Sequence, residues 1–151
     1  MRSCSTNPFP QHPHQPRQGR DVLIRITRNP IRPEAAIETV RKRAYGAVIV
    51  YVGTVRDVSH DRRVIFMEHQ VSLQDLARQE LERIVEEIGL KWHLEDISII
   101  HRIGKLRTGE ILLVVAIGAP HRVEAFEACQ YAIDRFKEVS HQWTTETLEP
   151  A

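Results

Sequence analysis

Four basic side chains stand where a strand or a helix is predicted to begin or end: Arg56, His121, Arg122 and Lys137. A group of Arg, His and Lys suits an anionic substrate, and a lysine whose pKa is depressed by neighbouring cations can act as an acid, a base or a nucleophile. Composition alone does not distinguish such a site from four ordinary surface cations. The question is therefore whether the fold brings these side chains together.

His121 and Arg122 are placed by the run before them. Residues 111–117 are uninterruptedly apolar and rich in Val and Ile, which predicts a strand buried on both faces. Pro120 then favours the start of a helix. We expect His121 and Arg122 in its first turn, where free N–H groups and the helix dipole favour an anion such as a phosphate.

The same helix carries Lys137 near its other end. Its predicted inward stripe has apolar residues at spacings of three and four: Phe126, Cys129, Ile133 and Phe136. His121 and Lys137 lie roughly 24 Å apart on one straight helix, too far to touch one small ligand from a single chain. Either they serve different purposes, or a symmetric dimer brings Lys137 of one chain near His121 of the other. We take the dimer as the hypothesis.

Arg56 follows a second predicted buried strand, residues 46–53, and opens a polar loop. A loop residue beside the end of a central strand is a candidate for contacting a ligand. An ion pair with Asp57 or Asp61 explains Arg56 equally well.

The remaining segments predict an α+β fold, a mixed and mostly antiparallel sheet with helices packed against it. The predicted order is strand 21–27, helix 34–43, strands 46–53 and 63–69, a helix from Ser72 to Gly89, strands 96–101 and 110–117, and the helix after Pro120. We expect two antiparallel pairs, 46–53 with 63–69 and 96–101 with 110–117, the second as a hairpin whose loop carries Gly109.

Local signals place the ends of two helices. Ser72 is expected to cap its helix, with Asp75 three residues on, and Gly89 to end it. The cluster Arg41-Lys42-Arg43 is predicted to form the solvated last turn of helix 34–43.

The totals indicate one globular domain over 21–151 and a disordered Pro- and His-rich tail over 1–20. A formal net charge of +1 gives no sign of nucleic acid, and no apolar run is long enough to span a membrane or act as a signal peptide. Cys4 and Cys129 do not make a disulfide framework, so a cytoplasmic location is expected.

Common catalytic motifs are absent from the sequence: there is no Gly-rich phosphate loop, Cys-x-x-Cys, His-Glu-x-x-His or Gly-x-Ser-x-Gly. His69, His101 and His121 do not have the spacing of a metal site. Cys129, on an inward stripe, is expected to be a small core residue rather than a nucleophile.

Ordered blocks of residues resemble the large, catalytic subunit of molybdopterin synthase, from about residue 40 to Glu146. The blocks are Gly46-Ala-Val-Ile-Val-Tyr-Val-Gly-Thr-Val-Arg56, Met67-Glu-His69, Ile100-His-Arg-Ile-Gly104, Gly118-Ala-Pro-His-Arg122, Ala125-Phe-Glu-Ala128 and Asp134-Arg-Phe-Lys137. Several blocks in order at matching spacing make a specific signal.

The resemblance implies an α/β-hammerhead fold and a homodimer that binds two small ubiquitin-like subunits, giving a heterotetramer. The small subunit ends in Gly-Gly and carries sulfur as a thiocarboxylate. Two sulfurs would pass to cyclic pyranopterin monophosphate and form the molybdopterin dithiolene, without a metal or other cofactor. The implied substrate contacts are Thr54, Val55, Arg56, His121, Arg122, Lys137 and, after Trp143, Thr144, Thr145 and Glu146, with Lys137 as the catalytic amine.

Two departures from the family pattern leave an alternative open. The family carries a second active-site lysine directly after the tryptophan that corresponds to Trp143, where this chain has Thr144. The chain also ends soon after Glu146, where relatives commonly continue. The alternative is a catalytically impaired paralogue that serves as a dimeric binding module for the ubiquitin-like subunit. A third reading, an unrelated binder of phosphate ligands, would require the block resemblance to be accidental.

Overall fold

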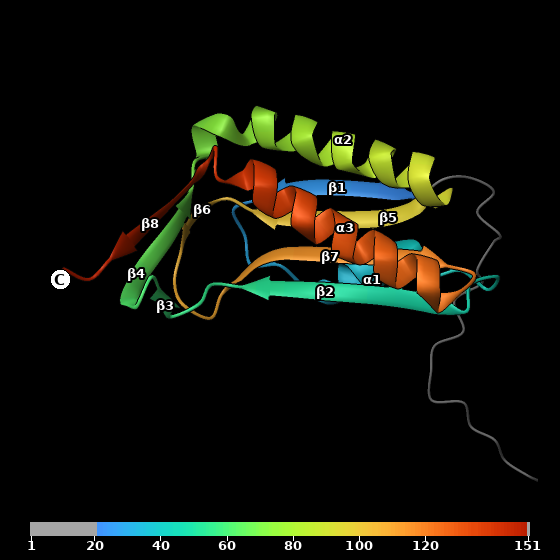
Figure 1. Cartoon of the computed structure of the whole chain (residues 1–151), viewed down its shortest axis with the longest axis horizontal. Helices are drawn as coiled ribbons and strands as arrows, with labels where there is room; N and C mark the ends of the chain where they lie inside the picture. The colour runs from blue at the N-terminus through green and yellow to red at the C-terminus, as the bar shows by residue number, and fades with distance from the viewer. Residues whose placement is uncertain (1–20, 151) are drawn as a thin grey trace, which may run out of the picture.

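The computed structural model describes residues 21–150 (Figure 1); the prediction of a disordered tail over 1–20 lies outside them. The elements in order are β1 (Val22–Thr27), α1 (Pro33–Val40), β2 (Ala47–Thr54), β3 (Val58–Ser59), β4 (Arg62–His69), a short 3-10 turn η1 (Val71–Leu73), α2 (Gln74–Trp92), β5 (Asp96–Arg102), β6 (Gly104–Leu106), β7 (Ile111–Ala119), α3 (Arg122–Ser140) and β8 (Thr144–Leu148). Within residues 21–150 no helix is long and apolar enough to cross a membrane.

The larger sheet has the strand order β1-β5-β7-β2. Its central strands, β5 and β7, are antiparallel and almost entirely buried. β7 carries the longest apolar run of the sheet, because both of its faces are covered. This confirms the predicted pairing of 96–101 with 110–117. β1 is parallel to β5 and β2 is antiparallel to β7, so the sheet is mixed and mostly antiparallel, as predicted.

A second, smaller sheet forms around β4, which pairs antiparallel with β3, β6 and β8. The predicted pairing of 46–53 with 63–69 is therefore wrong. β2 pairs with β7, more than fifty residues away in the chain, and β4 leaves the first sheet altogether. Three strands were not predicted: β3, in the polar loop after Arg56, β6, inside the expected hairpin loop, and β8, after the last predicted helix. All three are polar or short, and only their pairing with β4 makes them strands.

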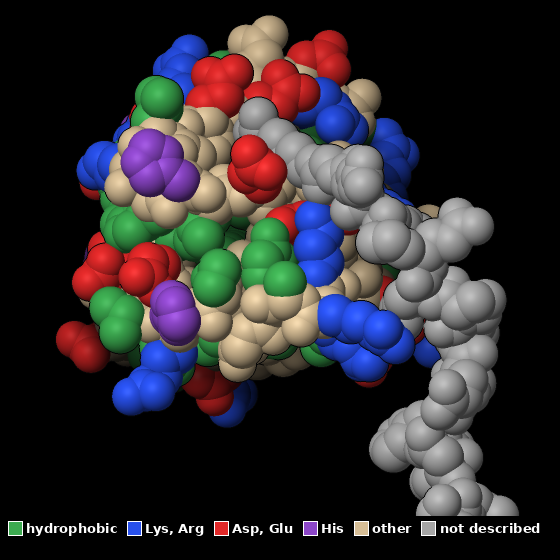
Figure 2. Space-filling view, turned by 90° about the vertical axis from the view of Figure 1, so that its right-hand side faces the viewer, with side chains coloured by type: hydrophobic (Ala, Val, Ile, Leu, Met, Phe, Trp, Pro, Cys, Tyr) green, Lys and Arg blue, Asp and Glu red, His purple; other side chains and the backbone are tan. Residues whose placement is uncertain are grey.

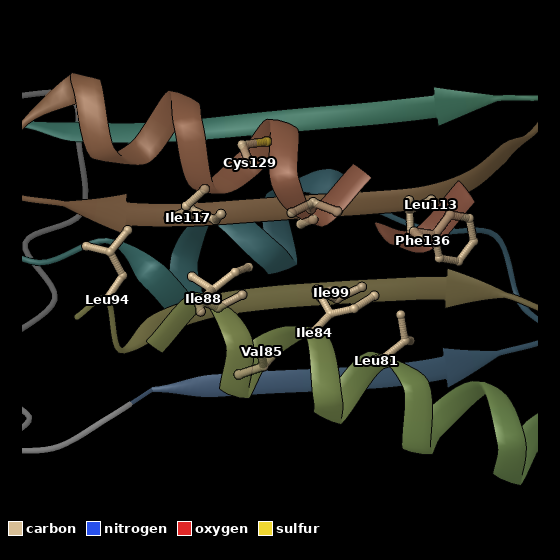
Figure 3. Packing of buried hydrophobic residues seen from close by; sticks show 14 of the residues in the cluster. Leu81, Ile84, Val85, Ile88, Leu94, Ile99, Leu113, Ile117, Cys129 and Phe136 are labelled. Atoms are coloured by element: carbon tan, nitrogen blue, oxygen red, sulfur yellow. The ribbon is translucent and has the colours of Figure 1, made fainter. Parts of the chain in front are cut away.

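Alternation along the central strands separates two apolar layers. Ile97 and Ile99 face α2 and α3, together with Leu113 and Ile117 from β7 (Figure 3). Ile100 faces α1 on the opposite side of the sheet. Figure 1 shows α2 and α3 lying side by side across one face, with α1 behind the strands. The period of two along a strand thus builds a three-layer core.

Two helix ends differ from their predicted positions. Ser72 lies in the 3-10 turn, and α2 begins after it with no side-chain cap. The helix runs beyond Gly89 to Trp92, and His93 ends it in the left-handed conformation while its N–H donates to the Gly89 carbonyl. Gly89 therefore supplies the acceptor of the terminal hydrogen bond rather than the left-handed residue itself.

Helix α1 ends at Val40, so Arg41-Lys42-Arg43 lies in the following loop and not in a helical turn. Lys42 contributes to structure rather than to a solvated surface alone. Its ammonium lies 2.7 Å from a carboxylate oxygen of Asp96, whose side chain is fully buried. The Tyr45 hydroxyl also donates to Asp96. A buried carboxylate needs such partners, and together they attach this loop to the start of β5.

The buried stripe of α3 is built mainly from small residues: Ala125, Ala128, Cys129, Ala132, Phe136 and Val139. Phe126 was predicted to face inward, but it is 58% exposed. Alanines allow the helix to approach the sheet closely, so they occupy the stripe although larger apolar residues lie beside it. Cys129 is buried as predicted, and burial raises the pKa of its thiol to about 11, which suits a core residue.

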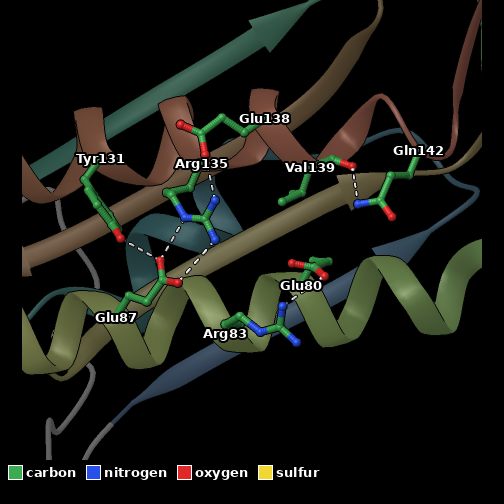
Figure 4. A network of polar contacts seen from close by, with 8 residues as sticks. All are labelled: Glu80, Arg83, Glu87, Tyr131, Arg135, Glu138, Val139 and Gln142. Carbon is green, nitrogen blue, oxygen red and sulfur yellow. Dashed lines mark hydrogen bonds and ion pairs between the residues drawn. The ribbon is translucent and has the colours of Figure 1, made fainter.

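A polar network joins α2 to α3 on their outer side (Figure 4). The Glu87 carboxylate accepts hydrogen bonds from the Tyr131 hydroxyl at 2.6 Å and from Arg135 Nε at 2.9 Å. Arg135 also donates to Glu138 at 2.7 Å. The bonds from Arg135 are the main reason that the pKa of Glu87 lies below its usual value.

We expect Arg135→Met to lower the free energy of unfolding by about 1–2 kcal/mol, because two charge-assisted hydrogen bonds to Glu87 are lost. Urea unfolding at pH 7 would measure the change. Arg83→Met is the matched control: Arg83 pairs with Glu80 within one helix, but its side chain is 60% exposed. Equal losses in the two variants would contradict a stabilising role for the network between the helices.

Candidate functional site

The predicted site residues lie at two opposite ends of the molecule. Helix α3 starts beside the end of β7 and runs back across the sheet to the start of β8 (Figure 1). His121 is the residue that caps the helix N-terminus, and Arg122 is its first residue. Lys137 lies in the last turn, about 22 Å from Arg122 along the axis. One chain therefore does not bring His121 and Lys137 together.

Arg56 belongs to the same end as Lys137, because β2 runs toward the smaller sheet (Figure 1). Its position is set by its neighbour Val55, which is buried and bonded on both sides to the loop before β7. The Val55 N–H donates to the Glu110 carbonyl at 3.0 Å, and the Gly109 N–H donates to the Val55 carbonyl at 2.9 Å. Val55 is thus an anchor, and Thr54 and Arg56 on either side of it are exposed.

The other end is fixed by contact between two loops. The Gly46 N–H donates to the Pro120 carbonyl at 3.2 Å. A Cβ at position 46 would lie only 2.7 Å from that oxygen, so this approach requires glycine. The contact places Pro120 beside Gly46, just before the start of β2. Figure 2 looks onto this end of the molecule, where a strip of hydrophobic side chains has Lys and Arg to its right and acidic side chains to its left.

The four predicted cations are all exposed. Within residues 21–150 none of them forms an ion pair. In particular, Arg56 does not pair with Asp57 or Asp61, the alternative explanation for it. Their positive charge is therefore not compensated by a carboxylate of the described chain, and an anionic ligand can use it.

The predicted residues after Trp143 lie on β8. Thr145 and Glu146 pair with Glu68 and Met67 of β4, and both are exposed. Thr144 is half-buried, and its side chain is already engaged. Its hydroxyl lies 2.7 Å from the Ser140 carbonyl and 3.0 Å from Nδ1 of His69.

Two buried histidines that looked scattered in the sequence are in contact beneath this strand. The His69 and His101 rings pack edge to face with centroids 4.6 Å apart. His101 lies between two partners: Trp143 Nε1 donates to its Nε2 at 3.0 Å, and its Nδ1 lies 3.0 Å from the Leu112 carbonyl. A carbonyl only accepts, so Nδ1 carries the proton and the ring is neutral.

Burial determines the charge of both rings. It lowers the pKa of His101 to about 4, a shift partly opposed by the bond to Leu112. Burial, and to a smaller extent the neighbouring His101, lower the pKa of His69 to about 3. Nε2 of His69 is buried with no hydrogen-bond partner in the described chain. Sequence reasoning missed this pair. The only available signal was a histidine at the end of each of two strands that were not expected to meet.

No three His, Cys, Asp or Glu residues among those described are arranged to hold a metal ion.

The model of the MoaE protein family matches residues 26–139. The chain belongs to the family of molybdopterin synthase catalytic subunits. The catalytic subunit of Bacillus subtilis (strain 168) is 40% identical over 124 residues, which cover 82% of this chain and 78% of that protein. The family acts in molybdenum cofactor biosynthesis, as the resemblance implied.

Solved structures of the family agree with the fold. The crystal structure of molybdopterin synthase from Staphylococcus aureus matches with a TM-score of 0.72 and 32% identity, covering 87% of this chain and 93% of that one. A complex of subunits 1 and 2 of the molybdopterin-converting factor from Helicobacter pylori matches with a TM-score of 0.53, covering 84% and 83%. Its identity of 17% supports the fold alone. The α+β architecture with mixed sheets and three helices is thus that of the family.

Proposed function

We propose that the chain transfers sulfur from the C-terminal thiocarboxylate of a small ubiquitin-like subunit to cyclic pyranopterin monophosphate, forming the dithiolene of molybdopterin. The observation that carries the proposal is the set of exposed cations without a carboxylate partner in a chain of this family. Lys137 supplies the amine. Arg56, His121 and Arg122 bind the phosphate and stabilise the charge that develops during transfer.

The same proposal gives the chain a protein partner and a location. Membership of the family of molybdopterin synthase catalytic subunits supports a small sulfur-carrying subunit as the partner here. The reaction takes place in the cytoplasm, with residues 21–151 acting as a single domain. Thr54, at the end of β2, and Thr145 and Glu146, on β8, are exposed and would contact the incoming tail.

A homodimer reconciles the two ends of α3. We infer that Lys137 of one protomer works with His121 and Arg122 of its partner, because roughly 22 Å separate the two ends within one chain. Two features favour self-association. β2 is an edge strand of the larger sheet, and Val123 and Phe126 on α3 are more than half exposed although apolar.

Mixed dimers would test this arrangement. One chain carries Lys137→Ala, the other carries His121→Ala with Arg122→Ala, and the heterodimer is purified through two different tags. A site shared between protomers leaves one of the two sites intact, so we expect about half of the wild-type activity per dimer. Each homodimer of a variant should be inactive. A heterodimer as inactive as both homodimers would mean that each site lies within one chain.

The alternative, a binding module without efficient chemistry, is favoured by one observation: the residue at position 144 has no amine, and its hydroxyl is engaged internally. A single-turnover assay separates the two. The chain is mixed with a thiocarboxylated small subunit and cyclic pyranopterin monophosphate, and dithiolene product is measured. Product establishes the synthase activity, whereas binding of the small subunit without product would leave the binding module.

A further inference from the structure

The Thr144 hydroxyl lies between two groups of the protein itself. It has one proton, and the Ser140 carbonyl at 2.7 Å is an acceptor only, so the hydroxyl donates there. Its oxygen then accepts from Nδ1–H of His69 at 3.0 Å. Ser140 is the last residue of α3 and Thr144 the first of β8. The hydroxyl therefore connects the end of the helix, the start of the strand and the end of β4.

A second set of hydrogen bonds, made by Trp143, holds the same junction. The Gln70 N–H donates to the Trp143 carbonyl at 2.8 Å. The Trp143 indole, fully buried, donates to His101, which in turn donates to the Leu112 carbonyl of β7. The junction is thus hydrogen-bonded to both sheets: the His69 imidazole connects it to β4, and the His101 imidazole connects it to β7.

We propose that His69 and Thr144 are positioning residues of the sulfur-transfer site, which fix the α3–β8 junction without touching the substrate. The proposal rests on the proposed function for the role of Lys137. That lysine lies three residues before Ser140, and Thr145 and Glu146 follow Thr144 directly. A shift of the junction would move all three. The role differs from the substrate contact that the family resemblance implies for position 144.

The geometry explains why a threonine is suited to this place. A hydroxyl can donate to the Ser140 carbonyl and accept from the imidazole at once, whereas an ammonium has donors and no acceptor. A lysine at position 144 would leave the His69 N–H buried without an acceptor. Groups of this kind are costly to leave unpaired, so His69 and Thr144 are expected to act as a unit.

Matched pairs of variants would test the unit. Thr144→Val removes the hydroxyl at nearly constant shape and Thr144→Ser keeps it; His69→Leu removes the donor and His69→Asn keeps an N–H near the Nδ1 position. The single-turnover rate and the KM for the pterin phosphate are measured below the onset of unfolding of each variant. We expect Thr144→Val and His69→Leu each to lower the rate about tenfold and to leave KM within about twofold. Thr144→Ser and His69→Asn should stay near wild type.

The double variant decides whether the two residues act together. His69→Leu with Thr144→Val should be no slower than either single variant, because the bond is already lost in each. Multiplied losses, an unchanged rate in Thr144→Val, or a raised KM with the rate retained would each overturn the proposal, the last by showing a direct substrate contact.

Hydrogen exchange provides a readout that does not depend on turnover. The amides of Thr145–Leu148 should exchange at least tenfold faster in Thr144→Val and His69→Leu, while those of β2 and β7 keep their wild-type rates. Unchanged exchange in β8 would overturn the anchoring. If the wild-type chain made no product, the proposed function would fail, and the exchange rates would still decide whether this junction is held as described.

Discussion

Lys137→Ala is expected to lower the single-turnover rate of dithiolene formation by about 10²–10⁴-fold, the range typical for removal of a group that transfers protons or acts as a nucleophile. Lys137 is exposed in the last turn of α3 and forms no ion pair with the described residues, so its loss should leave the fold intact. Thermal unfolding of the variant would confirm that the protein is folded before rates are compared.

Two further variants make the result specific. Lys137→Arg keeps the positive charge but cannot release a proton near neutral pH; a rate as low as that of the alanine variant would indicate that the amine itself is needed. Lys91→Ala removes another exposed helical lysine and should leave the rate unchanged. Lys91 lies on α2, and its ammonium packs over the Tyr131 ring of α3. A rate for Lys137→Ala within threefold of wild type would remove Lys137 from the mechanism.

Acidification from pH 6.5 to pH 5 is expected to lower the free energy of unfolding by about 3 kcal/mol. Burial holds the pKa of His69 at about 3 and that of His101 at about 4, against an ordinary value of 6.5. Between these values the unfolded chain binds more protons than the folded chain. On acidification the free energy of the unfolded chain therefore falls faster than that of the folded chain. The stability that the neutral rings provide near pH 7 is lost as the pH falls.

Urea unfolding between pH 5 and 7 would measure the loss, since this window lies above the ordinary titration of the carboxyl groups. His69→Asn should remove about half of the pH dependence, because one of the two buried imidazoles is gone. The His141→Asn variant, which alters an exposed histidine, controls for the loss of an imidazole anywhere in the chain. A wild-type stability that is flat across this window would show that the two rings titrate normally.

The sequence predicted the parts of the fold that depend on local pattern. The strands β5 and β7, the helices α2 and α3 and the antiparallel pairing of β5 with β7 all follow from periodicity and composition. It failed where a distant partner decides the structure. β8 reads Thr-Thr-Glu-Thr-Leu and has no apolar alternation, so only its pairing with β4 makes it a strand.

The candidate site divides in the same way. Arg56, His121, Arg122 and Lys137 could be named because each stands near the end of an element that the sequence predicts. The linkage of His69 to Thr144 could not, since it joins residues on two strands whose pairing was not foreseen. Phe126 shows the opposite error: hydrophobicity favoured it for the core, but close packing on the sheet selected the alanines beside it.

The pairing of β4 with β8 also constrains how the chain folds as it is made. His69 leaves the ribosome 75 residues before Thr144, its partner in the register, a delay of roughly 4–15 s at ordinary rates of synthesis. During that time one edge of β4 is open, and Ile65, half exposed even in the finished fold, lies on that strand. The open edge of β4 therefore exposes the nascent smaller sheet to wrong strand pairing and to capture by chaperones until β8 is made.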